Sequence, residues 1–264
     1  MTRRTQSPGL ALITAIVAIF MLTPMVLSTT AALVNNYSQG LASGLTLRWL
    51  EQVITVYGQT VVWSIAIAVA CVIGNILIGV PAAYALARNP SRWAKTFEEI
   101  LTLPVAVPGL ATGLALILAY GTLRDFRQSY SFILVGHMIF TLPFLVRTVT
   151  AAFQRPDLVA MDEAAKTLGA NFRQRFLGIL VPAVLPAIAA GSLMVFTLSI
   201  GEFNLTWMLH TPLTRTLPVG LADSYASMRL EVGSAYTLVF FIVVLPMLWL
   251  LQWCTHLLEK KYAN

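Results

Sequence analysis

The sequence predicts an all-α membrane protein with six transmembrane helices, and three observations carry that prediction. Of its 264 residues, 58% are apolar, and the mean hydropathy is +0.77. Only 11% of the residues are charged, whereas a soluble domain carries about 25%. The charges leave six gaps, each long enough for a helix of about 20 residues that crosses about 30 Å of hydrocarbon. These gaps are residues 5–47, 52–87, 100–123, 128–146, 176–201 and 232–258.

Within these gaps we expect helices near residues 10–33, 57–86, 100–120, 130–149, 183–200 and 235–257. The chain then divides into an N-terminal helix with its outer loop (1–56), a five-helix core (57–258) and a short cytoplasmic tail (259–264). Prolines within and beside the apolar runs favour bent helices, because proline removes a backbone donor. Gly109 and Gly113 form a G-x-x-x-G pattern in the third span, which indicates close helix packing.

The basic residues predict that both termini face the cytosol. The expected connections fall into two alternating sets, of which one holds twelve Lys and Arg residues and the other five. Short loops rich in Lys and Arg stay in the cytoplasm, so the first set is placed inside. Arg3 and Arg4 before the first span also suit a secretory signal peptide. The apolar run after them exceeds the roughly 7 to 15 residues of such a signal, which favours a retained helix.

Several function classes lack their residue patterns in this sequence. There is no G-x-x-x-x-G-K-[ST], H-E-x-x-H or G-x-S-x-G. The two cysteines, Cys71 and Cys254, lie far apart in apolar runs, which indicates neither a disulfide framework nor a metal site. The spans hold no paired carboxylates or Ser/Lys dyad, so an intramembrane enzyme is disfavoured. We expect no cofactor or metal in this chain, and no nucleic-acid partner despite a net charge of +6.

Residues 150–182 form the one long connection, and their first half has the pattern of a short helix. Pro156 suits the first turn, and Asp157 suits the positive end of the helix. Gly169 suits the left-handed position just beyond the helix end. The sequence therefore predicts a helix between these residues.

One face of this helix is expected to be apolar, with residues spaced i, i+3, i+7 and i+10: Leu158, Met161, Ala165 and Leu168. Asp162 and Lys166 are expected to pair on another face. A helix shorter than about 12 residues is unstable alone in water, so the apolar stripe needs a partner. Because the stripe lacks the aromatic residues and basic flanks of an interfacial helix, a protein groove is favoured over the membrane surface.

A second short helix is expected in the same loop. Asn171 followed by Gln174 resembles a capping box. The helix should run from Phe172 to about Leu180, where Pro182 interrupts it. The loop is thus predicted to expose a helix, a turn and a helix to the cytosol.

The same residues resemble the EAA loop of inner-membrane permeases of ATP-binding-cassette (ABC) importers, which a solute-binding protein feeds. Glu163-Ala164-Ala165 is followed after three residues by Gly169, and nine further residues lead to Ile179 and to Val181-Pro182. The family pattern ends in Leu-Pro, so Val181 departs from it. The resemblance extends from about residue 44 to residue 250.

Shorter motifs resemble one branch of that family. They are Gly44-Leu45-Thr46-Leu47-Arg48-Trp49, the segment 81–88 with the sequence PAAYALAR, and Thr216-Leu217-Pro218. The branch includes permeases for spermidine and putrescine, 2-aminoethylphosphonate, ferric iron and thiamine. The resemblance favours a small amine-bearing solute.

The resemblance implies a type I importer fold in the bacterial inner membrane. It implies two permease subunits, two cytoplasmic ATPase subunits that use ATP and Mg, and a periplasmic solute-binding protein. We expect the second permease to be a different chain. It also implies that the EAA helix docks in a cleft of the ATPase, and the coupling residues would be Leu158, Met161, Glu163, Ala164, Ala165, Leu168 and Gly169. Gly169→Pro and Glu163→Lys should then uncouple ATP hydrolysis from transport.

Polar residues within and beside the spans are the candidates for the translocation pathway, because an unpaired polar group in hydrocarbon is costly. They are Ser199, Glu202, Asn204, Thr206 and His137. Glu202 could attract an amine; the alternatives are a residue at a helix end that lies in water, or a partner of Arg215 or of a second subunit. His137 has no acidic residue in its own charge-free run, which favours a structural histidine bonded to another helix.

Two functions from different classes remain. One is the permease subunit of a binding-protein-dependent importer. The other is a proton-coupled secondary transporter, in which His137 and Glu202 would be the relay. The EAA loop favours the importer, since secondary transport needs no helix that docks on an ATPase.

Overall fold

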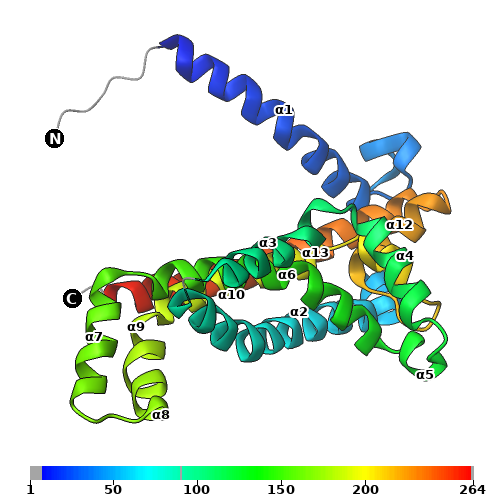
Figure 1. The fold of residues 1–264 in the computed structure, drawn as a ribbon. Helices are drawn as coiled ribbons and strands as arrows, with labels where there is room; N and C mark the ends of the chain where they lie inside the picture. Colours follow the sequence, from blue (N-terminus) through cyan, green and yellow to red (C-terminus); the bar gives the residue numbers. More distant parts are fainter. Residues whose placement is uncertain (1–7, 90, 263–264) are drawn as a thin grey trace. The chain divides into compact units, whose positions relative to one another are not determined.

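The computed structural model describes residues 8–89 and 91–262, and these residues are mostly helical (Figure 1). Outside the helices, the pairing between extended segments of the described chain is a single β-bridge between Val34 and Leu45. The all-α class is therefore confirmed. Arg3 and Arg4, and the last two residues of the expected tail, lie outside the described residues.

The chain forms two compact units. The first holds the described residues up to Gln59 together with Gly220–Val243, and the second holds Thr60–Val219 with the described residues from Val244 onward. Two long helices contribute to both units: α2 (Arg48–Arg88) and α13 (Leu230–Tyr262).

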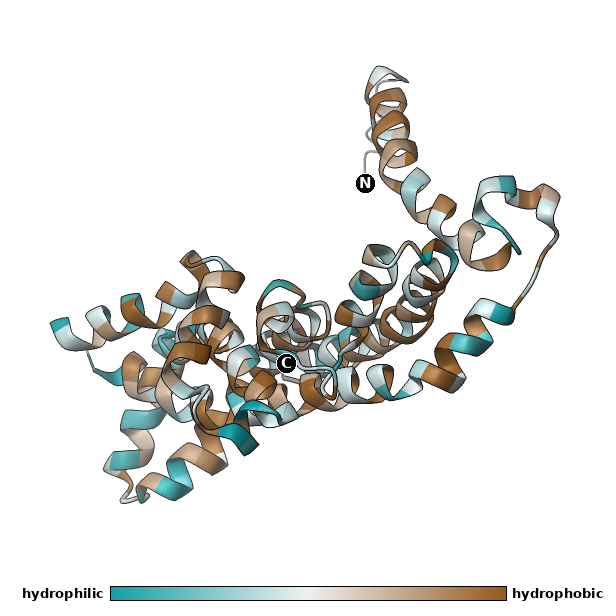
Figure 2. Cartoon of the chain, turned by 90° about the vertical axis from the view of Figure 1, so that its right-hand side faces the viewer, coloured by the Kyte–Doolittle hydropathy of each residue, from teal (hydrophilic) through white to brown (hydrophobic). Residues whose placement is uncertain are grey.

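The first unit begins with α1 (Pro8–Leu33), which is apolar along most of its length (Figure 2). None of the most apolar window of α1 is buried within the chain. A short 3₁₀ segment, η1 (Tyr37–Ser43), follows, and the unit also contains most of α12 (Leu217–Ala226).

Polar contacts hold the connections of this unit together. The Trp49 indole donates to the Val34 carbonyl at 2.9 Å. The Tyr37 backbone amide donates to the Glu231 carboxylate at 2.9 Å. These bonds tie η1 and the ends of α1, α2 and α13 to one another.

The second unit contains the remaining helices. They are α3 (Arg92–Ala106), α4 (Gly109–Tyr120), α5 (Arg124–Arg127), α6 (Tyr130–Phe153), α7 (Pro156–Thr167), α8 (Phe172–Arg175), a π-turn η2 (Phe176–Leu180), α9 (Val181–Ala183), α10 (Leu185–Ile200) and α11 (Asn204–Leu209).

Two apolar clusters form the core of this second unit. The larger joins α2, α6, α7 and α10 through buried residues such as Ala83, Leu145 and Leu158. The smaller joins α2, α4, α6 and α11 around Phe132 and Leu205. α2 and α6 contribute to both clusters, so these two helices run through the core of the unit.

Glycines allow helices of this unit to approach closely. A Cβ on Gly113 would lie 2.6 Å from Cβ of Met208, and one on Gly109 would lie 3.1 Å from the backbone nitrogen of Leu205. The predicted G-x-x-x-G pattern is thus a packing site, between α4 and α11.

Four helices are long and apolar enough to cross a membrane: Gly9–Leu33, Arg48–Arg88, Tyr130–Phe153 and Leu230–Leu257. The third and fifth predicted spans are bent pairs instead. Arg92–Ala106 and Gly109–Tyr120 meet at 106°, and Phe172–Ala183 and Leu185–Ile200 meet at 67°. Six spans result only if each bent pair is one span.

Proline explains the sharper bend. Val107, which precedes Pro108, has φ −88° and ψ 132°, an extended conformation. A residue before proline is driven out of the helical region by the proline ring, and Pro108 has no amide to continue the helix. The bending that the prolines predicted is therefore present here, and the span expected near 100–120 is a bent pair that begins at Arg92.

Candidate functional site

The 150–182 loop folds into two short helical segments that lie side by side, α7 and α8 with η2 (Figure 1). Pro156 occupies the first position of α7. Arg155 Nη2 lies 2.5 Å from Asp157 Oδ2, and this hydrogen bond lowers the pKa of the Asp157 carboxyl. Gly169 has a φ of +85°, which is the predicted left-handed position after the helix.

The predicted capping box is also present. The Asn171 side chain accepts from the Gln174 amide, and the Gln174 side chain accepts from the Asn171 amide, both at 2.9 Å. The helix does not stop at Pro182 as expected. The Val181 amide donates to the Phe176 carbonyl in a wider π-type turn, and the break comes at Val184. This wider turn accommodates Pro182, which has no amide to donate.

The predicted apolar stripe of α7 is divided between two faces. Leu158 is 1% exposed and Ala165 8% exposed, and both pack within the chain. Met161 is 48% exposed and Leu168 88% exposed. The interpretation of all four as one docking surface was therefore wrong. Leu158 and Ala165 are seven positions apart and share one face of the helix. Met161 and Leu168 lie about 60° to 80° around the helix axis from Leu158.

Asp162 points inward rather than toward Lys166, so the predicted pair is also wrong. Asp162 is 6% exposed, and its Oδ2 lies 3.2 Å from Arg88 Nε. Arg175 Nη1 bonds its other oxygen, and the Tyr84 hydroxyl donates to Oδ2 at 3.3 Å. We call these four residues the Asp162 cluster.

Sequence reasoning missed the Asp162 cluster, although one signal was available. Asp162 lies four residues after Leu158 and three before Ala165, so it shares their buried face. A charge on the inward face of a helix requires a buried partner. The pairing partners, Arg88 and Arg175, were counted only as loop charges.

The pathway candidates lie elsewhere in the second unit, and four of them form a closed polar group. His137 on α6 contacts Ser199 Oγ through Nδ1 and Thr206 Oγ1 through Nε2, each at 2.8 Å. Glu202 Oε2 lies 3.9 Å from His137 Nε2. We call His137, Ser199, Glu202 and Thr206 the His137 cluster; tertiary folding supplies the acidic neighbour that the charge-free run lacked.

Within the His137 cluster, Glu202 accepts hydrogen bonds from backbone amides at the start of α11. Its carboxylate oxygens accept from the amides of Leu205 and Thr206, both at 2.8 Å, and Oε2 also accepts from the Thr206 hydroxyl at 2.8 Å. Its side chain is 8% exposed. Glu202 therefore lies at a helix end, but it is buried and not in water as that alternative expected. The contacts of His137 agree with its interpretation as a histidine bonded to another helix. Asn204 is exposed and outside the cluster.

A second polar group adjoins this one on α6. The Thr141 hydroxyl donates to the His137 carbonyl at 2.8 Å and accepts from Asn75 Nδ2 at 2.7 Å. Cys71 Sγ lies 3.2 Å from the same hydroxyl. Hydrogen bonds therefore connect α2, α6 and α10 within this unit. The residues that they join are all buried: Asn75, Thr141, His137 and Ser199.

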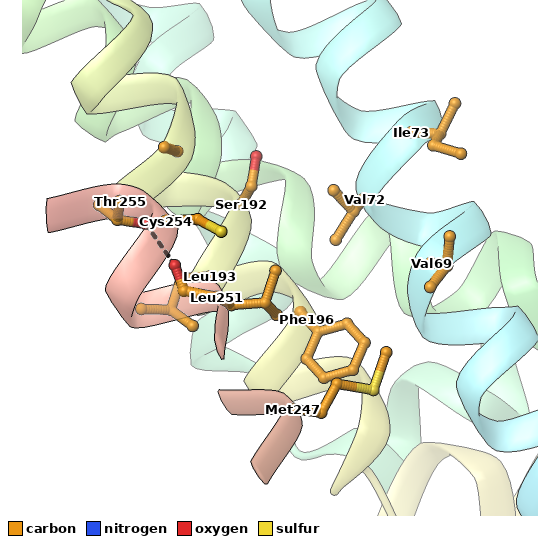
Figure 3. A pocket seen from close by; sticks show the side chains of 11 residues that line it. Val69, Val72, Ile73, Ser192, Leu193, Phe196, Met247, Leu251, Cys254 and Thr255 are labelled. Atoms are coloured by element: carbon orange, nitrogen blue, oxygen red, sulfur yellow. Dashed lines mark hydrogen bonds between the residues drawn. The ribbon is translucent and has the colours of Figure 1, made fainter. Parts of the chain in front are cut away.

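The second unit also has an apolar cavity of about 300 Å³ between α2, α10 and α13 (Figure 3). Val72, Phe196 and Leu251 are among its lining side chains. The Thr255 hydroxyl at its edge donates to the Leu251 carbonyl. A polar solute would find few hydrogen-bonding groups there, so this cavity is unsuited to one.

In the described part of the chain, no three or more His, Cys, Asp or Glu side chains gather in a way that could hold a metal ion. The polar side chains of the His137 cluster instead bond one another. Among the exposed apolar side chains of the second unit are Met161 and Leu168, at the outer face of α7.

Comparison with known proteins gives this arrangement a family context. Residues 75–264 match the family model described as "Binding-protein-dependent transport system inner membrane component". The molybdenum transport system permease protein ModB of Mycobacterium tuberculosis is 28% identical over 199 residues, which cover 70% of this chain and 74% of ModB. PhnV of Salmonella typhimurium, assigned to 2-aminoethylphosphonate transport, is 24% identical over 246 residues and 92% of each chain.

A solved structure has the same fold. It is a bacterial ABC transporter involved in the import of the acidic polysaccharide alginate, and a chain of it superposes with a TM-score of 0.71. The superposition covers 93% of this chain and 95% of that one, at 19% sequence identity. The likeness concerns the fold alone.

Proposed function

Because the chain belongs to the family of binding-protein-dependent transport system inner membrane components, it is a permease of an ABC importer in the bacterial inner membrane, and we propose that α7 couples it to the ATPase. The family works with an ATPase and a solute-binding protein. Nothing in this family supports the alternative of a proton-coupled secondary transporter. The permease role of the relatives also agrees with a chain that is not itself an enzyme.

One observation carries the proposed coupling role of α7. Its outward face presents Met161, Ala164 and Leu168, and all three are exposed, on a helix whose opposite face is fixed within the chain. Large apolar side chains at the tip of a loop favour burial in a partner groove. Glu163 and Lys166 are exposed beside them and would supply charges at the rim.

The coupling set that we propose is accordingly narrower than the sequence suggested. Met161, Glu163, Ala164 and Leu168 would contact the ATPase. Leu158 and Ala165 would hold α7 in place from behind, since both are buried. Gly169 would set the turn that ends the helix, because its φ of +85° favours glycine.

We further propose that two permeases and two ATPase subunits form the importer, with a different chain as the second permease. The exposure of α1 supports this arrangement. Its apolar window is 0% buried, so α1 is available to pack on a second permease in the membrane. Purification of an active importer that contains this permease as its sole membrane chain would contradict the heterodimer.

For the solute, we propose a small molecule with a tetrahedral oxyanion group. The relatives named above are assigned to molybdenum and to 2-aminoethylphosphonate. The bonds of Glu202 within the His137 cluster also argue against a free carboxylate that would attract an amine. An aminophosphonate would still satisfy the amine expectation from the sequence. Uptake of labelled molybdate, 2-aminoethylphosphonate and putrescine, each competed by the others, tests this choice; uptake of putrescine alone would contradict it.

The coupling proposal is tested by co-purification of the ATPase from detergent-solubilised membranes. Leu168→Asp and Glu163→Lys should each reduce the amount of ATPase recovered with the permease, because they place a charge in an apolar groove and reverse a charge at its rim. Leu213→Asp is the matched control, since Leu213 is 77% exposed and lies outside the loop. Full recovery of the ATPase with both α7 variants would refute the assignment of α7.

A further inference from the structure

A single carboxylate connects the inner face of α7 to two other helices. Asp162 Oδ2 lies 3.2 Å from Nε of Arg88, the last residue of α2. Its Oδ1 bonds Arg175, the last residue of α8. The side chains are mostly buried, with 20% exposure for Arg88, 14% for Arg175 and 9% for Asp162. The Arg175 contact is a charge-assisted hydrogen bond, which is stronger than a neutral one, whereas Arg88 Nε contributes an ion pair without hydrogen-bond geometry.

The contact between α7 and α2 is reinforced on both sides of this carboxylate. Arg88 Nη2 donates to the Leu158 carbonyl at 3.4 Å, one turn earlier in α7. The Tyr84 hydroxyl donates to Asp162 Oδ2. The ring of Tyr84 packs at 5.6 Å from that of Phe153 and 5.3 Å from that of Phe176. α7 is therefore fixed to the end of α2 by ionic and hydrogen-bonding contacts, while the Tyr84 ring packs the same end of α2 against α6 and η2.

The covalent connections of α7 are weaker links by comparison. At its start, Arg155 has φ −60° and ψ 133°, which breaks the helical path from α6. At its end, Gly169 is left-handed and its Cβ position meets nothing within 4 Å. Because both turns interrupt the helical path, neither can transmit a displacement of α7 along a continuous helix. The Asp162 cluster leads instead directly to α2, a helix of 41 residues.

From this geometry we propose that Asp162 is a positioning residue that makes α7 and the end of α2 move as one body, so that a displacement of α7 enters the membrane through α2. The inference rests on the proposed docking of α7 on the ATPase and adds the route that the displacement takes. Loss of the carboxylate leaves Arg88 and Arg175 with like charges facing one another, which separates the helices that it joined. α7 would then still bind the ATPase, but its movement would not reach α2.

The test uses the complete importer, with permeases, ATPase and solute-binding protein, in proteoliposomes. Asp162→Asn should leave ATPase recovery and ATP hydrolysis near the wild-type level and should lower the solute imported per ATP by about tenfold. Asp162→Glu keeps the charge and should restore much of this ratio. Asp125→Asn is the matched control: it makes the same change at an exposed residue of α5, outside the loop, and the ratio should not change.

A distance measurement supplies a second readout that a loss of stability alone would not give. Spin labels at Ala85→Cys on α2 and Thr167→Cys on α7, both exposed, are placed in a Cys254→Ser background. In the wild type, the distance between the labels should be the same with and without bound ATP. With Asp162→Asn, it should change when ATP binds. Arg88→Lys repeats both measurements with the charge retained, should the first variant assemble poorly.

Three outcomes would overturn the inference. The first is an unchanged import ratio with Asp162→Asn, and the second is a label distance that ATP binding leaves unchanged in that variant. The third is loss of ATPase binding together with the import ratio, which would make Asp162 part of the docking surface only. The proposed docking of α7 fails by a different result. In that case Leu168→Asp and Glu163→Lys retain the ATPase, whatever Asp162→Asn does.

Discussion

The His137 cluster and the Asp162 cluster each bury a carboxylate, but they satisfy it in different ways. Glu202 accepts hydrogen bonds from two backbone amides and one hydroxyl, all from residues three or four positions ahead in the chain. Asp162 is held by two guanidinium groups from other helices. Side-chain exposure is nearly the same, 8% for Glu202 and 9% for Asp162.

The difference lies in what each carboxylate joins. Glu202 secures the local turn between α10 and α11, and His137 then attaches that turn to α6. Asp162 joins elements that are distant in the sequence and that meet only through side chains. Removal of the first should therefore reduce the stability of the fold, whereas removal of the second should reduce the transmission of movement between helices. Each of the following experiments tests that division.

The largest effect is expected for Glu202→Ala. The change leaves the amides of Leu205 and Thr206 without an acceptor in a buried site, which should lower the free energy of unfolding by about 3 kcal/mol. Thermal unfolding in detergent measures it. Asn204→Ala is the control, because Asn204 is exposed. Wild-type thermal stability combined with altered solute selectivity would place Glu202 in the pathway and contradict the division.

A smaller loss is expected for His137→Leu. The substitution removes both hydrogen bonds of the imidazole, but Thr206 keeps its bond to Glu202, so only Ser199 loses its partner in the cluster. The free energy of unfolding should fall by about 2 kcal/mol. Denaturant unfolding of the purified permease measures the change, and Ser199→Ala should show less than half of it. A larger loss of transport than of stability would favour a role for His137 in the pathway.

For Gly169→Ala we expect a still smaller cost, and one confined to the loop. A Cβ at this φ of +85° is strained by about 1 kcal/mol even though no neighbouring atom obstructs it. Gly178→Ala is a matched control in the same loop, since its Cβ also meets nothing within 4 Å and its backbone is helical. Uptake should fall with Gly169→Ala alone, at nearly constant thermal stability. Equal uptake for the two variants would mean that the turn does not matter for coupling.

Features that depend only on neighbouring residues in the chain could be predicted from the sequence. The start, the stop and the capping box of the 150–182 loop followed from local rules, because Pro156, Gly169 and Asn171 each act on their own backbone neighbours. The third and fifth spans were located by hydropathy. Their bends of 106° and 67° depend on how proline is accommodated within the fold, so only a tendency to bend was predictable.

Which face of a helix is buried depends on partners that are distant in the sequence. The spacing of Leu158, Met161, Ala165 and Leu168 described an apolar side of α7, but Arg88 and Tyr84 decide that Asp162 turns inward and that Met161 stays outside. Likewise, Glu202 bounds a different charge-free interval from the one that holds His137, and only the packing of α10 and α11 on α6 brings them to 3.9 Å. Local patterns selected the residues of the α7 stripe and the pathway candidates, but tertiary contacts decided which of them face inward and what they bond.

The smallest expected effect separates the ionic contacts of the Asp162 cluster from its aromatic packing. Tyr84→Phe removes the hydrogen bond of 3.3 Å to Asp162 Oδ2 and keeps the ring against Phe153 and Phe176. Because both guanidinium groups still hold the carboxylate, the free energy of unfolding should fall by only about 0.5 kcal/mol. The double variant with Asp162→Asn decides where that loss arises, since two changes that remove the same contact are not additive. If the hydroxyl acts through Asp162, Tyr84→Phe should cost little further stability and no further import per ATP in the Asp162→Asn background. Full additivity would mean that the Tyr84 hydroxyl stabilises the loop independently of the carboxylate, and it would then not belong to the connection between α7 and α2.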